Sequence, residues 1–180
     1  MKISVIGAGN VGGLAAARIA AENIGEVCLI DIAPKLAQAK AFDMDDARAL
    51  LHHDLSVTGS EDLSDIKNSD IIVCTAGLAR KPGMTREDLL AKNCAIIDGI
   101  SQHIRKLAGD AIVIMVTNPL DLMTYFMFKK LKFGRRRVFG MGLTLDAARF
   151  ANLISKELSH PITGIQACVI GSHGEAMLPL

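Results

Sequence analysis

The sequence has 180 residues, of which half are hydrophobic and 22% are charged, a balance typical of a globular chain large enough to bury a core. Its 20 basic and 19 acidic residues leave a net charge of +1, which argues against a nucleic acid or a membrane surface held by bulk charge. No apolar stretch is long enough to span a bilayer and no signal-type cleavage site follows the first residues, so a cytoplasmic protein without a membrane partner is expected.

Short apolar runs alternate along the chain with longer amphipathic segments. In chain order, strands are predicted over residues 2–6, 26–32, 70–75, 111–116, 138–140 and 164–170, and helices over 11–21, 35–51, 87–107, 120–130 and 144–158. Strands that alternate with helices form parallel βαβ units, and near-continuous apolar strands belong to a sheet covered on both faces. The pattern predicts an α/β fold with a doubly wound parallel sheet over residues 1–142, followed by the start of a second, α+β domain over 143–180.

The helix over residues 87–107 has the clearest pattern. Apolar residues recur at three- and four-residue spacing at Leu90, Cys94, Ile97, Ile100, Ile104 and Leu107. Thr85 precedes this helix and Asp88 follows three residues later, which resembles a capping box with Asp in place of Glu. The helix is therefore expected to begin just after Thr85.

The four cysteines show no Cys-x-x-Cys pair. Cys28, Cys74 and Cys168 fall within predicted strands, where cysteine packs as a small buried hydrophobic residue. Metal ligands need clustered spacing, which these residues lack. Neither a disulfide nor a metal site is expected.

A glycine motif, Gly7-Ala8-Gly9-Asn10-Val11-Gly12, lies between the first predicted strand and the first predicted helix. A bare match to GxGxxG is a weak signal that a surface loop also satisfies, but a dinucleotide site needs this strand-to-helix context. The first glycine permits a tight turn, the second lets the backbone approach a pyrophosphate, and the third allows close helix–strand packing. The motif predicts a Rossmann-type nucleotide site at the start of the helix.

Asp31 ends the second predicted strand, about 20 residues beyond the glycines, where the dinucleotide fingerprint carries an acid. Its carboxylate can accept hydrogen bonds from both ribose hydroxyls and would repel a 2′-phosphate. NAD is therefore the expected cofactor, in preference to NADP. The alternative is that Asp31 only caps a turn before Pro34.

Four later segments carry polar groups at the ends of predicted elements: Ala76–Arg86, Val116–Asp121, Leu145–Phe150 and Gly171–Glu175. With the glycine motif, they occur in the order found in one family. The sequence closely resembles the malate dehydrogenases of the lactate-dehydrogenase-like group, and the resemblance extends over essentially all 180 residues. It implies oxidation of (S)-malate to oxaloacetate with NAD, a step of the tricarboxylic acid cycle, and a homo-oligomer in the full-length form.

The resemblance assigns the proton-transfer residues and one substrate residue. His173 matches the family's catalytic histidine, and Asp146 matches the aspartate that orients this histidine and stabilises its charged form. Arg149 matches the arginine that holds the C1 carboxylate of the substrate, because a guanidinium binds a carboxylate through two hydrogen bonds. Asp146 and Arg149 are three residues apart, so one helix face can present both.

The resemblance also implies a mobile lid and further cofactor contacts. Arg86 matches the residue that polarises the reacting carbonyl, and Arg80 stands where lactate dehydrogenases have Gln and malate dehydrogenases have Arg. A second substrate carboxylate needs a second cation, so Arg80 favours a dicarboxylate. Asn118 matches a residue that contacts both substrate and nicotinamide. The remaining residues matching cofactor contacts are Asn93, Val116 and Thr117.

One departure from the family is serious: its members are considerably longer and use the additional residues to complete the substrate domain. The start of that domain, over residues 143–180, is therefore expected to be incomplete. The main alternative function is a non-catalytic NAD-binding fragment or pseudo-enzyme. Lactate dehydrogenase is a weaker alternative, disfavoured by Arg80. A milder departure is Glu175, where Asp is usual.

Overall fold

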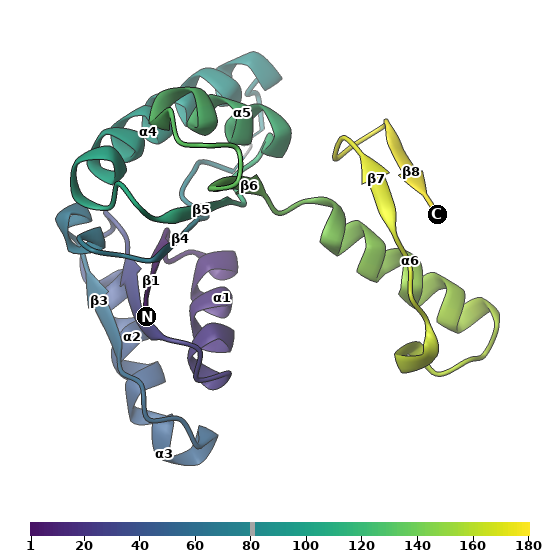
Figure 1. Cartoon of the computed structure of the whole chain (residues 1–180), viewed down its shortest axis with the longest axis horizontal. Coiled ribbons are helices and arrows are strands. Elements are labelled where there is room, and N and C mark those ends of the chain that lie inside the picture. Colours follow the sequence, from purple (N-terminus) through teal and green to yellow (C-terminus); the bar gives the residue numbers. More distant parts are fainter. Residues whose placement is uncertain (80–81) are drawn as a thin grey trace. The chain divides into compact units, whose positions relative to one another are not determined.

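The computed structural model describes residues 1–79 and 82–180 and divides into two compact units, Met1–Phe139 and Gly140–Leu180 (Figure 1). The first unit contains a six-stranded sheet with helices on both faces. The second unit contains a helix and a two-stranded antiparallel sheet. The predicted fold class, a Rossmann-type doubly wound sheet followed by the start of an α+β domain, is confirmed.

The large sheet has the strand order β3-β2-β1-β4-β5-β6. Its strands are β1 (Lys2–Ile6), β2 (Glu26–Ile30), β3 (Val57–Ser60), β4 (Ile71–Cys74), β5 (Ile112–Met115) and β6 (Val138–Gly140). The pairs from β3 through β5 are parallel, and Ile6 at the end of β1 lies beside Ile30 of β2 and Cys74 of β4. The strand order reverses between β1 and β4, so a ligand is expected beyond the carboxyl ends of these strands.

Successive strand side chains point to opposite faces of the sheet and build two cores. Val5 and Leu29 pack on one face with α1 and α2, whereas Ile6 and Ile30 pack on the other with α4 and α5. The helices of this unit are α1 (Asn10–Ala21), α2 (Leu36–Asp46), α3 (Arg48–Leu51), α4 (Arg86–Leu107) and α5 (Leu120–Leu131), with a short 3-10 helix at Leu63–Ile66.

Helix α4 begins with the predicted capping box. Thr85 Oγ1 accepts a hydrogen bond of 3.0 Å from the Asp88 N–H, and Asp88 Oδ2 accepts one of 3.2 Å from the Thr85 N–H. Further along the helix, Ile97 and Ile104 are fully buried against the sheet, as their spacing predicted. The start and the buried face of this helix are therefore both confirmed.

The predicted helix over residues 35–51 is wrong as a single element. It divides at Ala47 into α2 and α3, because Arg48 Nε donates back to the Asp45 backbone oxygen at 3.2 Å and His52 adopts a left-handed conformation. Asp45 Oδ1 also accepts a hydrogen bond from the N–H of Val57, the first residue of β3. Strand β3 was not predicted, because Val57–Ser60 is a short edge strand that contains Gly59.

The second unit contains α6 (Leu143–Glu157), a 3-10 turn at Ile162–Gly164, β7 (Val169–Gly171) and β8 (Met177–Pro179). The predicted strand over residues 164–170 is therefore wrong in its bounds. Only Val169–Gly171 pairs with a neighbour, because β8 offers just three residues. Cys168 is exposed, contrary to the prediction that it would be buried. Among residues 140–180, only Gly142, Asp146 and Val169 are buried.

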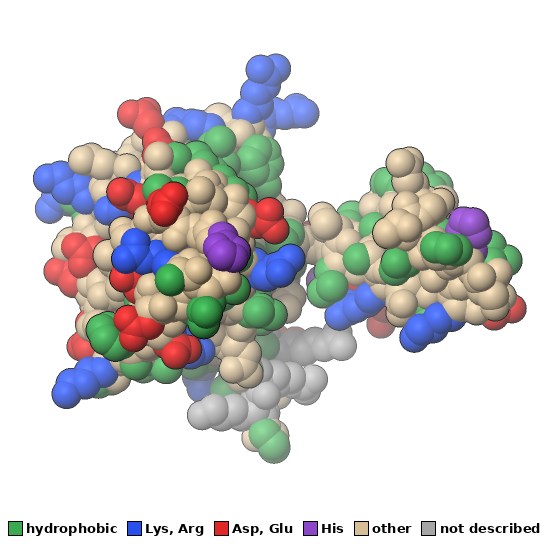
Figure 2. Space-filling model, turned by 90° about the horizontal axis from the view of Figure 1, so that it is seen from below, with side chains coloured by type: hydrophobic (Ala, Val, Ile, Leu, Met, Phe, Trp, Pro, Cys, Tyr) green, Lys and Arg blue, Asp and Glu red, His purple; other side chains and the backbone are tan. Residues whose placement is uncertain are grey.

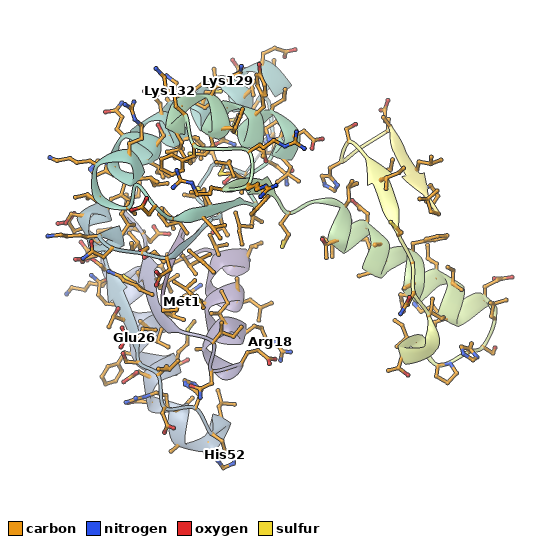
Figure 3. The ribbon with its side chains drawn as sticks, viewed as in Figure 1. Met1, Arg18, Glu26, His52, Lys129 and Lys132 are labelled. Carbon is orange, nitrogen blue, oxygen red and sulfur yellow. The ribbon has the colours of Figure 1, made fainter. Side chains whose placement is uncertain are left out.

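The first unit has a mixed surface. Acidic and basic side chains are interspersed over the face shown in Figure 2. Arg18 on α1 and Lys129 on α5 point outward (Figure 3), and Arg18 makes a 3.9 Å ion pair with Glu22, another exposed residue. Within the described parts of the chain, no helix is both long and apolar enough to cross a membrane.

Candidate active site

The glycine motif forms a tight turn between β1 and α1 that is closed on two sides and open on one. Gly7 has φ +105°, and a Cβ there would lie 2.7 Å from Thr75 Oγ1 and 2.8 Å from the Ala76 nitrogen. A Cβ at Gly12 would overlap the carbonyl oxygen of Gly7. A Cβ at Gly9, by contrast, would meet nothing within 4 Å. The backbone at Gly9 is therefore open to close approach by a ligand, as a pyrophosphate requires.

The start of α1 suits an anion. In the described chain, no side chain caps this helix and its first turn holds no acidic residue, so its terminal N–H groups lack a competing side-chain acceptor. The positive end of the helix dipole lies at the same point. These features fit the diphosphate of a dinucleotide at the glycine motif.

Asp31 lies just beyond β2, beside the glycine turn. Its Oδ2 accepts a 2.6 Å hydrogen bond from the Ala8 N–H, and its Oδ1 accepts a 2.8 Å bond from the Ala33 N–H. The bond to Ala33 agrees with the alternative of a local turn cap, whereas the bond to Ala8 holds the carboxylate at the nucleotide loop. A carboxylate oxygen can accept more than one hydrogen bond, so this arrangement is compatible with ribose hydroxyls as further donors.

A lysine for which the sequence predicted no role also reaches this loop. Lys40 on α2 donates from Nζ to the backbone oxygen of Ala8 at 2.8 Å and to that of Gly9 at 3.2 Å. The separation of 32 positions between Ala8 and Lys40 follows no spacing rule, so only the folded chain reveals the contact.

The residues after β4 and β5 form a hydrogen-bonded junction. Asn93 is fully buried on α4, where its Oδ1 accepts from the Leu78 N–H at 2.8 Å and its Nδ2 donates to the Asn118 backbone oxygen at 2.8 Å. Thr117 is also buried and donates to the Ala76 backbone oxygen at 2.7 Å. Asn93 and Thr117 therefore hold the backbone at the ends of these strands, while Asn118 is exposed there.

The second unit brings three predicted site residues together. His173 Nδ1 lies 2.6 Å from Asp146 Oδ2, and Arg149 Nη1 lies 3.2 Å from Asp146 Oδ1. Asp146 is buried in the first turn of α6, where the helix dipole stabilises its negative charge. Because a carboxylate accepts, His173 donates from Nδ1, which orients the imidazole ring. The side chains of His173 and Arg149 are 29% and 63% exposed, so both are accessible from solvent.

Two predicted substrate residues fall outside this description. Arg80 lies outside the described residues. The backbone of Arg86 begins α4 directly after Thr85, but its side chain is likewise not described.

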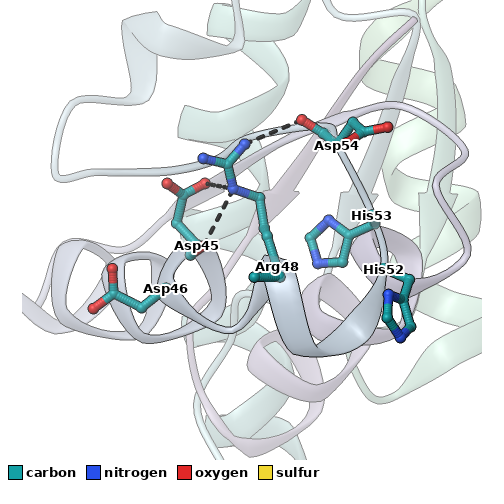
Figure 4. A pocket seen from close by; sticks show the side chains of 7 residues that line it. Asp45, Asp46, Arg48, His52, His53 and Asp54 are labelled. Atoms are coloured by element: carbon teal, nitrogen blue, oxygen red, sulfur yellow. Dashed lines mark hydrogen bonds and ion pairs between the residues drawn. The ribbon is translucent and has the colours of Figure 1, made fainter.

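A polar hollow lies at the end of α2 and α3 (Figure 4), lined by Asp45, Asp46, Arg48, Ala49, His52, His53 and Asp54. It contains none of the predicted site residues. Asp45 bonds the first residue of β3, so the hollow belongs to the amino ends of the strands, opposite the glycine turn. Arg48 makes a 3.1 Å ion pair with Asp45 and donates to the Asp54 backbone oxygen. The Arg48 guanidinium is thus engaged by other residues of the hollow.

The buried cysteines belong to the core. Burial raises the pKa of the Cys74 thiol to about 11 and also raises that of Cys28. Both residues pack in the hydrophobic cluster between the sheet and helices α4 and α5. Among the described residues, no group of three or more His, Cys, Asp or Glu side chains is placed to hold a metal ion.

Comparison with known proteins identifies relatives of both units. The profile of the family described as "lactate/malate dehydrogenase, NAD binding domain" matches residues 1–140. The malate dehydrogenase of Methanosarcina barkeri is 49% identical over 179 residues, which is 99% of this chain and 58% of that protein. This chain therefore spans somewhat more than half the length of the relative.

Solved structures give the same result for the fold. The malate dehydrogenase of Picrophilus torridus superposes with a TM-score of 0.95 at 39% identity, covering 99% of this chain and 57% of that one. The lactate dehydrogenase of Cryptosporidium parvum, solved with lactic acid and nicotinamide adenine dinucleotide, has a TM-score of 0.93 at 35% identity, covering 99% and 56%. Because enzymes of both names share this fold, the fold alone does not separate the two substrates.

Proposed function

Because the chain belongs to the lactate/malate dehydrogenase family, we propose that it oxidises (S)-malate to oxaloacetate with NAD. The family match covers the NAD-binding domain, so NAD is the cofactor. The observation that carries the proposed chemistry is the 2.6 Å contact between His173 Nδ1 and Asp146 Oδ2, because it orients a histidine for proton transfer.

The reaction needs a hydride acceptor, a base and groups that hold the substrate. Bound NAD supplies the acceptor for the hydride that leaves C2 of malate. His173 takes the proton of the C2 hydroxyl at Nε2, since Nδ1 donates to Asp146. The buried carboxylate of Asp146 then stabilises the positive charge on the imidazole. In the reverse direction, His173 returns the proton to the carbonyl oxygen.

Arginines hold and select the substrate in this proposal. Arg149 binds the C1 carboxylate, and Arg86 polarises the C2 oxygen. Arg80 pairs with the C4 carboxylate, which lactate lacks, and so favours a dicarboxylate over lactate. Support for these roles comes from the family motifs, and for Arg149 also from its position beside Asp146.

Specificity for NAD rather than NADP follows from Asp31. Its two bonds hold the carboxylate beside the glycine turn, where a 2′-phosphate would meet a fixed negative charge. Asn93, Val116, Thr117 and Asn118 would complete the cofactor site at the ends of β4 and β5. We propose a cytoplasmic location for the protein and, as the family resemblance implies, a homo-oligomer in its full-length form.

Malate oxidation by this chain is tested by malate-dependent formation of NADH, alongside titration with NADH. His173→Asn should abolish turnover but leave NADH binding intact, whereas His160→Asn, which changes an exposed histidine of the same unit, should change neither. Equal activity in the His173 variant would refute the assignment of the base.

A second candidate is a non-catalytic NAD-binding fragment, favoured by the observation that only three residues of the second unit are buried. NADH binding without any malate-dependent turnover in the unmodified chain would support this candidate and refute the enzymatic proposal. For substrate choice, Arg80→Gln should impair oxaloacetate reduction much more than pyruvate reduction. Equal losses would mean that Arg80 does not read the second carboxylate.

A further inference from the structure

Lys40 is held against the nucleotide loop by three separate contacts. Its Nζ donates to the backbone oxygens of Ala8 and Gly9, at 2.8 and 3.2 Å. Its aliphatic stem packs on α1, since a Cβ at Gly13 would lie 3.1 Å from Lys40 Nζ and 3.3 Å from Cδ. A flexible lysine loses side-chain entropy when it is held in this way, so the contacts must be favourable enough to compensate.

The two carbonyl groups that Lys40 binds belong to the peptide units of the glycine turn. The oxygen of Ala8 shares a planar peptide with the N–H of Gly9, and the oxygen of Gly9 shares one with the N–H of Asn10. In a trans peptide the N–H and the C=O point in opposite directions. The ammonium group of Lys40 binds the oxygen side of these two peptides, so their N–H groups point away from it. A cation at the oxygen polarises each peptide and makes its N–H a stronger donor.

The position of this charge favours a bound anion at the loop. Lys40 Nζ lies at the first turn of α1, where the helix dipole is already positive. Within the described residues, the first turn of α1 holds no acidic residue and no side-chain cap that would offset the lysine charge and the helix dipole. Asp31 places one carboxylate at the loop, where it bonds the Ala8 N–H. A bound diphosphate would add negative charge beside the start of α1.

We propose that Lys40 is a positioning residue for the pyrophosphate of the dinucleotide. From behind the glycine turn, it fixes the carbonyls of Ala8 and Gly9 and strengthens the N–H groups that face the phosphates. The role rests on the NAD-binding part of the proposed function and does not depend on the malate reaction. It distinguishes phosphate recognition, which needs Lys40, from recognition of the nucleoside, which uses Asp31.

The test compares three ligands in the full 180-residue chain: NADH, ADP and adenosine, with affinities from competition NMR so that weak binding is measured. Lys40→Met should weaken NADH and ADP on the order of fivefold, the effect of one partly screened charge, and leave adenosine unchanged. This loss should shrink as salt is added. Lys40→Arg, which keeps the charge, should retain most of the ADP affinity.

Lys129→Met is the matched control, because it removes an exposed lysine from α5 on the opposite face of the sheet (Figure 3). It should leave all three affinities unchanged. Equal weakening of ADP and adenosine by Lys40→Met would show a merely structural role, and unchanged ADP affinity would show no role; either result overturns the proposal. Absence of NADH and ADP binding in the unmodified chain would overturn the cofactor site itself.

Discussion

Two alanine substitutions in the glycine motif should separate packing from ligand binding. At Gly12, the new methyl group would overlap the carbonyl oxygen of Gly7 and lie 2.5 Å from Thr75 Oγ1. The main obstacle is backbone, so α1 itself must shift. Overpacking of this kind costs about 1–3 kcal/mol, and each kcal/mol lowers Tm by about 2–4 °C in a chain of this size.

At Gly9, the same substitution should leave stability unchanged. The backbone there has φ −64° and ψ −164°, which alanine adopts without strain, and the new Cβ would meet no atom within 4 Å. The methyl group instead occupies the open side of the turn. If it overlaps the pyrophosphate at a cost of about 1–3 kcal/mol, NADH affinity should fall by about 5–150-fold.

Thermal unfolding followed by circular dichroism and titration with NADH measure the two effects. Gly99→Ala is the control: it lies on the exposed side of α4 with no atom within 4 Å of the added Cβ, and should stabilise the helix by about 0.5–1 kcal/mol without changing NADH binding. Full NADH affinity in Gly9→Ala would refute the inference that this side of the turn receives the diphosphate. Unchanged stability in Gly12→Ala would refute the packing argument.

Three further predictions concern side chains in both units. Asn93→Ala should destabilise the chain by about 1–3 kcal/mol in denaturant unfolding, because the fully buried Asn93 amide bonds both the Leu78 N–H and the Asn118 backbone oxygen. A pure cofactor-contact role predicts no loss. Iodoacetamide at mildly alkaline pH should modify the exposed Cys168 in the folded chain but spare Cys74, because the raised pKa of Cys74, about 11, leaves little thiolate to react. Mass spectrometry that showed early alkylation of Cys74 would contradict this. A hydrogen bond from Lys130 on α5 lowers the pKa of Asp98, so the ion pair stabilises the fold above the ordinary Asp pKa and stops doing so as pH falls through the lowered value. Asp98→Asn should therefore lower Tm near neutral pH but not in strong acid. An equal loss of Tm at both pH values would contradict this.

The local sequence was sufficient for the elements whose signals lie within a few residues. The glycine motif predicted the turn between β1 and α1, and Thr85 with Asp88 predicted the start of α4, because caps and tight turns depend on neighbouring atoms. Alternation of apolar runs with amphipathic segments predicted the doubly wound sheet, since each strand must bury both faces. The helix face at Ile97 and Ile104 followed from periodicity alone.

Other features depend on partners far along the chain, which no local pattern specifies. Strand β3 exists because β2 offers an edge, while the predicted strand at 164–170 shrinks to Val169–Gly171 because only β8 pairs with it. Cys168 lies just before the strand residues of β7 and its side chain is exposed.

The site residues divide in the same way. Family motifs pointed to His173 and Asp146, but only the fold brings them within 2.6 Å across 27 residues. Asn93 was predicted as a cofactor contact, and tertiary structure shows its amide joining the ends of β4 and β5. Lys40 drew no prediction, because its contact depends on how α2 packs beside α1. Hydrogen bonds between distant segments form only where packing brings both partners together, so the sequence determined which groups were available and the tertiary structure decided which of them meet.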